Sequence, residues 1–291
     1  MIFSVVIPVY NDFDRLKLTL DSLNCQTFDY SLFEIIIVDN NSSSPILDFN
    51  SLYPDLDLRV IKESKIGSYA ARNTGIRNAK YDIIALTDSD CIPDKNWLRN
   101  AYRYFRIDKD NKIGILTGKV PLFYRDQFKL SFAETYEKYT GFDFLAYSKD
   151  NSCGAGNWFS YKSIFYSISF FDDTLKSNGD TKLSKIISNS VPLYYSEYIT
   201  VFHPSRYFVH EIVYKYRRLI GGTYQRRFKG DLTGFIRFML IFSYKRVTFS
   251  IKKLFTINFV DSFKILIVSF LIFFGSWSEF FNILIGKDTK R

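Results

Sequence analysis

The amino-acid sequence predicts an α/β fold in which a mostly parallel central sheet is flanked by helices and followed by a helical C-terminal extension. Three observations lead to this prediction: apolar runs alternate with helical segments before residue 200, polar clusters follow the apolar runs, and positive charge collects after residue 200. Of the 291 residues, 47% are hydrophobic and 24% are charged, so the chain can bury a core, and a disordered or low-complexity protein is excluded.

Short apolar runs provide the expected strands. They lie at residues 3–9, 33–38, 58–61, 83–86 and 113–117. Helical segments separate them: Leu16, Leu20 and Leu23 have helical spacing, and further helices are expected at 68–77 and 96–105. Because strands that alternate with helices usually pair in parallel, the pattern predicts one sheet covered by helices.

Polar residues gather where three of these strands end. Residues 8–11 close the first strand, 39–42 the second and 87–90 the fourth. In open α/β sheets, ligands bind beyond the carboxyl ends of the strands. The three clusters therefore predict one functional site at that edge.

Asp88 and Asp90, on either side of Ser89, are the main candidates for metal binding. Two carboxylates at a strand end can direct oxygens to a hard divalent cation that is shared with phosphate oxygens. Alternatively, these acids only cap the next turn.

Asp39 either accepts hydrogen bonds from a base or ribose, as acids at such strand ends do, or forms an Asx turn.

Arg72, Asp180 and His203 are the further candidates. Arg72 lies on the helix expected at 68–77, whose small residues allow close approach, and it offers a fork of donors for a diphosphate; a solvated surface arginine is the default interpretation. Asp180 opens a helical stretch, where it either caps the helix or acts as a general base. His203, one of two histidines, is either structural or a metal ligand.

Two common nucleotide-binding fingerprints are missing from the sequence. The segment 154–156 lacks the third glycine of a dinucleotide-binding motif, and no phosphate-binding loop ending in Lys-Ser or Lys-Thr occurs. Dehydrogenases and ordinary nucleoside triphosphatases are therefore not expected.

The C-terminal part carries the positive charge. Residues 201–291 contain 16 lysines and arginines against 5 acids, whereas the first 200 residues contain 23 against 25. Cations interleaved with aromatic residues suit an anionic membrane surface, with nucleic acid as the rival partner. The apolar stretch 265–286, in which Glu279 is the only acid, favours the membrane. This stretch is either one transmembrane helix, a segment lying in the membrane interface, or a buried core helix.

The cysteines indicate the compartment. Cys25, Cys91 and Cys153 are odd in number and widely spaced, which predicts a reduced, cytosolic setting. We therefore expect a protein at the cytoplasmic face of a membrane, either peripheral or held by one C-terminal span, with no nucleic-acid partner.

Taken in order, the sequence motifs resemble those of family 2 glycosyltransferases with the GT-A fold, a Rossmann-like α/β fold. The segments that carry the resemblance are 5–11, 36–42, 67–75, 86–90, 154–158 and 171–180. The resemblance implies a catalytic domain at 1–210, with a nucleotide-binding half at about 1–118 and an acceptor half at about 119–210. The basic and apolar composition of the remaining residues, 211–291, predicts a helical, membrane-associating region.

The resemblance also implies a role for each candidate residue. It places Pro8, Tyr10, Asn11, Asp39, Arg72, Asn73 and Asp88 in the nucleotide-sugar site, Asp88, Asp90 and His203 at a Mn²⁺ or Mg²⁺ ion, and Asp180 as the catalytic base. The implied reaction is an in-line displacement with inversion, because an acceptor hydroxyl attacks the sugar while the metal holds the departing diphosphate. The implied partners are a nucleotide-sugar donor, with a UDP-sugar expected, and a saccharide or lipid-linked saccharide acceptor in cell-surface polysaccharide or glycolipid assembly.

Several residues depart from the family pattern. Gly179 stands where the family usually has an acid before the base, and Lys182 stands where an acid often follows it, so Asp172 or Asp173 is an alternative base. The segment 224–228 resembles the Gln-Arg-Arg-Trp element of processive synthases but ends in Phe, and multiple clear spans are missing, so single-sugar transfer is expected. The alternative functions are a sugar nucleotidyltransferase, which would want a Gly-rich loop after the first strand, and an inactive scaffold on the same fold.

Overall fold

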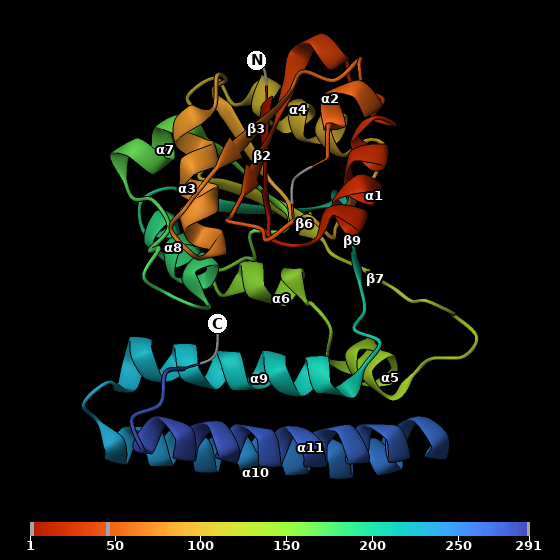
Figure 1. Ribbon diagram of the computed structural model, residues 1–291, viewed down its shortest axis with the longest axis vertical. Coiled ribbons are helices and arrows are strands. Elements are labelled where there is room, and N and C mark those ends of the chain that lie inside the picture. The colour runs from red at the N-terminus through yellow and green to blue at the C-terminus, as the bar shows by residue number, and fades with distance from the viewer. Residues whose placement is uncertain (1–2, 45–46, 290–291) are drawn as a thin grey trace. The chain divides into compact units, whose positions relative to one another are not determined.

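The computed structural model describes residues 3–44 and 47–289 and divides the chain into two compact units (Figure 1). The sheet unit contains Met1–Pro121, Phe142–Thr174 and Gly179–His203. The helical unit contains Leu122–Gly141, Leu175–Asn178 and Pro204–Arg291. The helical unit therefore draws on two short segments from the middle of the chain as well as on its C-terminal part.

Four parallel strands form the first half of the sheet. They are β1 (Phe3–Val9), β2 (Phe33–Asp39), β3 (Leu58–Lys62) and β4 (Ile83–Leu86), in the order β3-β2-β1-β4. Every residue of β1 and β2 is buried, which explains why their sequences are continuous apolar runs rather than alternating ones. In register, Val9 faces Asp39 and Val6 faces Leu86, so the carboxyl ends of these strands meet at one edge.

The second half of the sheet is mixed. It contains β8 (Trp158–Tyr161), which is antiparallel to β4, then β6 (Ile115–Lys119), β9 (Leu193–Pro204) and β5 (Ile92–Pro93). β6 and β9 pair in parallel, whereas β5 pairs with β9 in the antiparallel sense. The α/β fold with a central sheet is confirmed, and the parallel pairing that the sequence predicts dominates only its first half.

Helices flank the strands of the sheet unit, and Figure 1 shows α1 and α3 on either side of β1 and β2. These helices are α1 (Phe13–Leu23), α2 (Phe49–Leu52), α3 (Ser68–Asn78), α4 (Trp97–Ile107), α6 (Phe144–Lys149), α7 (Lys162–Ser167) and α8 (Gly179–Ser188), with a short 3-10 turn, η1, at Tyr30–Leu32. Gly75 explains how closely α3 packs on the sheet, because a Cβ atom there would lie 2.3 Å from a methyl carbon of Val6.

The helical unit is built from long helices. They are α5 (Phe132–Thr140), α9 (Val209–Thr223), a π-helical turn η2 (Tyr224–Phe228), α10 (Leu232–Thr256) and α11 (Phe259–Leu284), and the unit also includes the two-residue strand β7 (Leu122–Phe123). Side-chain caps start three of these helices: Ser131 begins α5, Asp231 begins α10 and Asn258 begins α11. Two apolar clusters join the helices, one around Ile212 and Ile265 and the other around Phe235 and Phe280.

Within the described residues, α11 is the helix long and apolar enough to cross a membrane. Its charged side chains nevertheless bind other parts of the helical unit. Asp261 accepts a hydrogen bond from Tyr139 at 2.9 Å, Lys264 donates to the Leu130 carbonyl at 2.8 Å, and the buried Glu279 binds an arginine of α9. One side of α11 is therefore an internal side of the bundle.

Candidate active site

The residues after β1 make the first part of the site edge. Pro8 is buried in β1, and its backbone nitrogen is on the side of β4. Because the pairing with β4 ends at Val6, the lack of an N–H at Pro8 costs no hydrogen bond between these two strands. Tyr10 is half exposed. Asn11 has a positive φ of 51°, and its side-chain oxygen accepts from the Ser43 amide at 2.8 Å. Asn11 thus ties the loop after β1 to the loop after β2.

Asp39, the last residue of β2, and Asn40, which follows it, are buried and hydrogen-bonded. Asp39 is 5% exposed, and its Oδ1 accepts from the Ser42 amide at 3.1 Å, one residue further along the chain than in an Asx turn. Asn40 donates to the carbonyl of Lys65 at 2.7 Å and accepts from the Gly67 amide at 2.7 Å. Asn40 therefore fixes the start of α3 against the end of β2, a positioning role that sequence reasoning did not assign.

α3 contributes two of the candidate residues. Arg72 is almost buried and donates a hydrogen bond to Asp88 Oδ1, while its buried Nε has no partner among the described residues. Asn73 is 1% exposed, and both ends of its amide bind the backbone of Phe171, at 2.8 and 3.1 Å. Arg72 thus reaches the end of β4, whereas Asn73 uses its polar atoms to hold the segment before α8.

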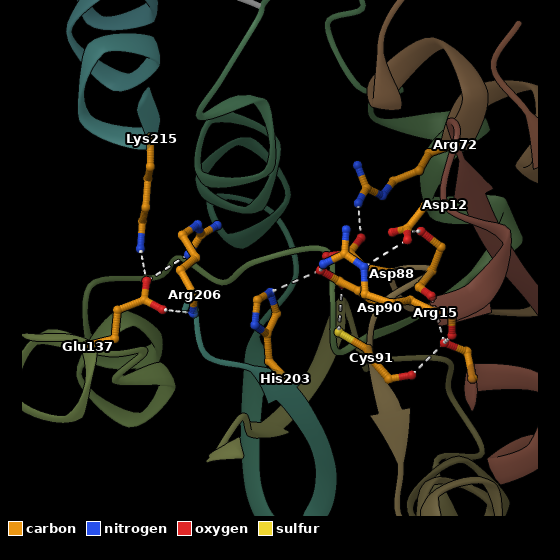
Figure 2. A network of polar contacts seen from close by, with 12 residues as sticks. Asp12, Arg15, Arg72, Asp88, Asp90, Cys91, Glu137, His203, Arg206 and Lys215 are labelled. Carbon is orange, nitrogen blue, oxygen red and sulfur yellow. Dashed lines mark hydrogen bonds and ion pairs between the residues drawn. The ribbon is translucent and has the colours of Figure 1, made fainter. Parts of the chain in front are cut away.

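Asp90, which follows β4, lies close to an arginine and to two side chains that can bind a metal. Its Oδ2 lies 3.3 Å from Arg15 Nη1 and 3.9 Å from His203 Nε2, and Figure 2 shows His203 on β9 pointing toward it. The ligand atoms of Asp90, Cys91 and His203 all lie within 4.8 Å of one another. Burial raises the pKa of the Cys91 thiol well above its usual value, and the charges of Asp88 and Asp90 raise it further. The thiol is therefore protonated in the metal-free protein, and the carboxylate oxygen and imidazole nitrogen are the donors better suited to Mg²⁺ or Mn²⁺.

Asp12 and Arg15 belong to this site and were missed by the sequence reasoning. Arg15 Nε lies 2.7 Å from Asp12 Oδ1, so this one arginine bridges Asp12 and Asp90 (Figure 2). Burial raises the pKa of Asp12, and the charge of Asp90 adds to this effect while Arg15 opposes it. Their positions in the sequence could have indicated this role. Asp12 directly follows the polar end of β1, and Arg15 lies one helical turn further on.

Asp180 lies in the first turn of α8. Its Oδ1 accepts from the Thr181 amide at 2.9 Å and lies 3.4 Å from the hydroxyl of Tyr69, which itself accepts from the Gly179 amide at 2.9 Å. A Cβ atom at Gly179 would lie 2.7 Å from the Tyr69 ring. The packing of this tyrosine therefore explains the glycine at position 179, where the resemblance to the family leads one to expect an acid.

The two alternative bases are engaged by lysines. Asp172 Oδ2 lies 2.8 Å from the ammonium of Lys182, and Asp173 Oδ1 lies 2.8 Å from that of Lys65. Hydrogen bonds from Lys182 and Thr174 lower the pKa of Asp172, which weakens it as a base. Among the three acids, the geometry therefore favours Asp180.

The structure brings Asp88 and Asp180 to one short segment. A Cβ atom at Gly156 would lie 3.0 Å from Asp88 Oδ2, and one at Gly154 would lie 3.6 Å from Asp180 Oδ2. Tyr69 and Arg72, which contact Asp180 and Asp88, are three residues apart and so lie on one face of α3. Acids from the two halves of the sheet unit thus line one site, next to a guanidinium and an Asp/His pair.

Solved structures show the class of protein to which this fold corresponds. The mannosyltransferase PcManGT from Pyrobaculum calidifontis, solved with GDP-Man and Mn²⁺, matches 78% of this chain and 64% of its own with a TM-score of 0.58 and 18% identity. S. aureus TarS 1-349, solved with UDP-GlcNAc, matches 77% of this chain and 67% of its own with a TM-score of 0.56 and 19% identity. The fold is therefore that of nucleotide-sugar glycosyltransferases.

Sequence comparison identifies the family. The model of Glycosyl transferase family 2 matches residues 4–165, and the chain belongs to this family, as its motifs predict. Glycosyltransferase AglE of Haloferax volcanii is 29% identical over 211 residues, covering 70% of this chain and 67% of AglE. The glycosyltransferase YfnE of Bacillus subtilis is 33% identical over 143 residues, covering 47% of this chain but only 36% of YfnE. The protein is a glycosyltransferase, which argues against the alternative of a sugar nucleotidyltransferase.

Proposed function

We propose that this protein transfers one sugar from a UDP-sugar to a hydroxyl of a saccharide or lipid-linked saccharide acceptor, with inversion at the anomeric carbon, in cell-surface polysaccharide or glycolipid assembly. The observation that carries the proposal is the convergence of Asp88 and Asp180 on the segment 154–156. Further support comes from the UDP-GlcNAc complex of TarS and from a relative named as a minor teichoic acid biosynthesis protein, GgaA of Bacillus subtilis.

Arg72 and Asp39 form the donor side of the proposed site. Arg72 is held by Asp88 and keeps a buried Nε that can donate to a diphosphate oxygen. Asp39, at the end of β2, accepts hydrogen bonds from the nucleoside, and Pro8 and Tyr10 line the neighbouring strand end. The roles follow from position, because the carboxyl edge of the sheet is where such folds bind nucleotides.

Asp90 and His203, with Asp88 beside them, fit a divalent cation. Carboxylate oxygen suits both Mg²⁺ and Mn²⁺, and an imidazole nitrogen in the set favours Mn²⁺ over Mg²⁺. When bound, the cation supplies charge that stabilises the departing diphosphate. Arg15 neutralises Asp90 from the other side and keeps its carboxylate in place.

Asp180 takes the proton of the attacking hydroxyl. Tyr69 and the Thr181 amide bind Oδ1 of Asp180, while Oδ2 lies on the side of Gly154, 3.6 Å from where a Cβ atom of residue 154 would be. A carboxylate that is fixed through one oxygen can present the other to a substrate. A single displacement with one base inverts the anomeric carbon.

The helical unit holds the enzyme on the cytoplasmic face of a membrane. α10 contains no acidic residue, and it exposes Arg237, Lys245 and Lys252 beside apolar side chains. Five phenylalanines of α10 and α11 are more than half exposed, namely Phe255, Phe259, Phe270, Phe274 and Phe281. Cations next to exposed rings suit the surface of an anionic membrane. Because the charged side chains of α11 are bonded within the bundle, α11 lies along this surface rather than crossing it.

The proposed function is tested by UDP release and product formation from a panel of UDP-sugars with Mn²⁺ or Mg²⁺. We expect metal-dependent turnover in the native chain and at least about a hundredfold loss in Asp90→Asn, because the charge that stabilises the leaving group is no longer held. Asp110→Asn is the matched control, since Asp110 is an exposed acid paired only with Lys112. Equal activity of the two variants, or turnover that ignores EDTA, would contradict the proposal.

A further inference from the structure

The helical unit contains a cavity that the proposed transfer reaction does not use. Its volume is about 790 Å³, within the range of small-molecule sites. The lining residues come from α9, from the residues just before it, and from α11. They are Arg206, Val209, His210, Glu211, Val213, Tyr214, Lys215, Arg217, Arg218, Leu271 and Gly275. Four of them are lysine or arginine and one is acidic, so the lining is strongly cationic.

Buried glutamates hold three of these cations in place. Glu137, whose side chain is 3% exposed, lies 2.7 Å from Arg206 Nη1 and 3.1 Å from Lys215 Nζ, and Figure 2 shows both cations directed at it. Glu279, 1% exposed, lies 3.0 Å from Arg217 Nε. Ion pairs with these buried acids therefore fix the positions of Arg206, Lys215 and Arg217. The side chains of these three cations are only 22% to 26% exposed.

The positive charge of the cavity is not balanced. Arg206 and Lys215 both bind the carboxylate of Glu137, and the side chain of Arg218 donates to a backbone carbonyl, that of Lys176, at 3.4 Å. Burial lowers the pKa of Lys215, and the neighbouring charge of Arg206 lowers it further. Cations that are crowded and partly desolvated in this way are stabilised when an oxyanion binds beside them, because it supplies opposite charge and hydrogen-bond acceptors.

The other wall of the cavity is apolar and continues onto an exposed surface. Leu271 of α11 is 42% exposed, and Phe274, one helical turn away, is 54% exposed. Tyr214, on the α9 side, is 46% exposed. When the anionic group of a ligand binds among the cations, the rest of the ligand would therefore lie next to these apolar side chains. A free phosphate has no apolar part that could contact them.

We propose that this cavity binds the phosphate or diphosphate group of an acceptor that carries a long apolar chain, with the chain lying along Leu271 and Phe274. The inference deepens the proposed function and rests on it for the role of this ligand as the acceptor. It adds a recognition site for the acceptor that is separate from the residues placed around the donor.

Calorimetric titration of the full-length chain tests the proposal, with EDTA present so that no metal-dependent diphosphate binding occurs. The probes are geranyl diphosphate, inorganic pyrophosphate and geraniol. We expect geranyl diphosphate to bind at least about tenfold more tightly than pyrophosphate, and geraniol not to bind measurably. Equal affinity for the two diphosphates would overturn the apolar part of the proposal, and affinity for geraniol alone would overturn the anionic part.

Variants locate the binding. Arg218→Glu should weaken both diphosphates by about tenfold or more, and Tyr214→Ser should weaken geranyl diphosphate alone. Both variants are expected to fold, because Tyr214 is 46% exposed and Arg218 donates to a backbone carbonyl. Arg237→Glu, the same charge change on the exposed face of α10, should alter the affinity less than twofold. An Arg218→Glu protein with native affinity would overturn the proposal.

A donor-site variant separates this inference from the proposed function. In Asp90→Asn the release of UDP is expected to be lost, while the affinity for geranyl diphosphate should equal that of the native chain. If the native protein releases no UDP but still binds geranyl diphosphate, and this binding depends on Arg218, the proposed binding site in the cavity is supported and the proposed transfer function is contradicted. If Asp90→Asn loses geranyl diphosphate binding, the ligand occupies the donor site and the inference is wrong.

Discussion

At the scale of single residues, the position of Asp180 depends on one tyrosine. Tyr69 stacks on Phe171 with ring centroids 5.6 Å apart, and its hydroxyl reaches both the Gly179 amide and Asp180 Oδ1. Burial raises the pKa of Tyr69, and the charge of Asp180 raises it further, so the phenol stays protonated and can donate to the carboxylate. The glycine at 179 makes room for this arrangement.

Replacement of Asp180 tests its role as the base. Asp180→Asn should lower kcat for transfer by about a hundredfold to ten-thousandfold, because an amide cannot accept the proton of the acceptor hydroxyl. The affinity for UDP should stay the same. Asp172→Asn is the matched control, since Asp172 is already paired with Lys182. If Asp172→Asn shows the large loss of kcat and Asp180→Asn does not, the assignment of the base is wrong.

At the scale of elements, the strands that the sequence predicts best are those with continuous apolar runs. The runs 3–9 and 83–86 match β1 and β4 residue for residue, because strands buried on both faces carry little but apolar side chains. β9 was not predicted. Only three of its 12 residues are fully buried, so its sequence, rich in tyrosine and polar residues, has no apolar run to reveal it.

The site was predictable where it follows strands and less so where it depends on packing. Asp88 and Asp90 could be found because they follow an apolar run. Asp12 lies at the start of a helix, where an acid usually only stabilises the helix end, and Arg15 reads as its partner one turn further on. The expectation that the cations of residues 201–291 face a membrane needs correction for Lys215. Its side chain is directed at the buried Glu137 of α5, which is distant in sequence.

The ion pairs of Glu137 predict an acid-sensitive helical unit. Burial alone would raise the pKa of Glu137, but Lys215, Arg206 and the Arg206 amide outweigh burial and leave it lowered. A carboxyl whose pKa is lower in the folded state adds stability above its unfolded pKa of about 4.3, and this stability is lost as the pH falls through the folded value. Urea unfolding followed by helical circular dichroism should show this loss between about pH 5 and pH 3.

Glu137→Gln removes the charge that Arg206 and Lys215 share. It should cost about 3 kcal/mol of unfolding free energy at pH 7, because breaking one partner of a buried ion pair leaves the other charges uncompensated. It should also flatten the acid dependence. Glu197→Gln, at an exposed glutamate paired with Lys119, should cost less than about 1 kcal/mol. Similar costs for both variants would contradict the importance of the buried pairs.

At the scale of the whole molecule, charge divides between the two parts of the chain. Residues 201–291 hold the positive excess, and several of its cations turn out to be internal. The exposed cations that remain for a membrane surface include Arg237, Lys245 and Lys252 of α10, and Arg227, Lys229 and Lys287 outside it. The segment 224–228 forms a π-helical turn, in which Gln225 binds Thr289 at 2.7 Å and Arg226 donates to the Asn178 carbonyl at 3.3 Å.

Membrane attachment predicts a charge-dependent affinity for vesicles. The full-length chain should co-sediment with vesicles that contain phosphatidylserine, and less at high salt. The triple variant Arg237→Glu, Lys245→Glu and Lys252→Glu should bind more than about a hundredfold more weakly, at roughly 1 kcal/mol for each cation lost. The same change at Lys95, Lys109 and Lys149, exposed lysines of the sheet unit, should have little effect. Equal binding by both triple variants would contradict attachment through α10.

The central claim is that Asp88, Asp90 and Asp180 belong to one nucleotide-sugar site. The most direct measurement is a crystal structure of the chain soaked with UDP and Mn²⁺, with the metal located by its anomalous scattering. The account predicts a manganese peak at bonding distance from Asp90 and His203, with the diphosphate beside Arg72 and the uridine beside Asp39. A metal peak away from Asp90, or UDP bound away from the carboxyl edge of the sheet, would contradict it.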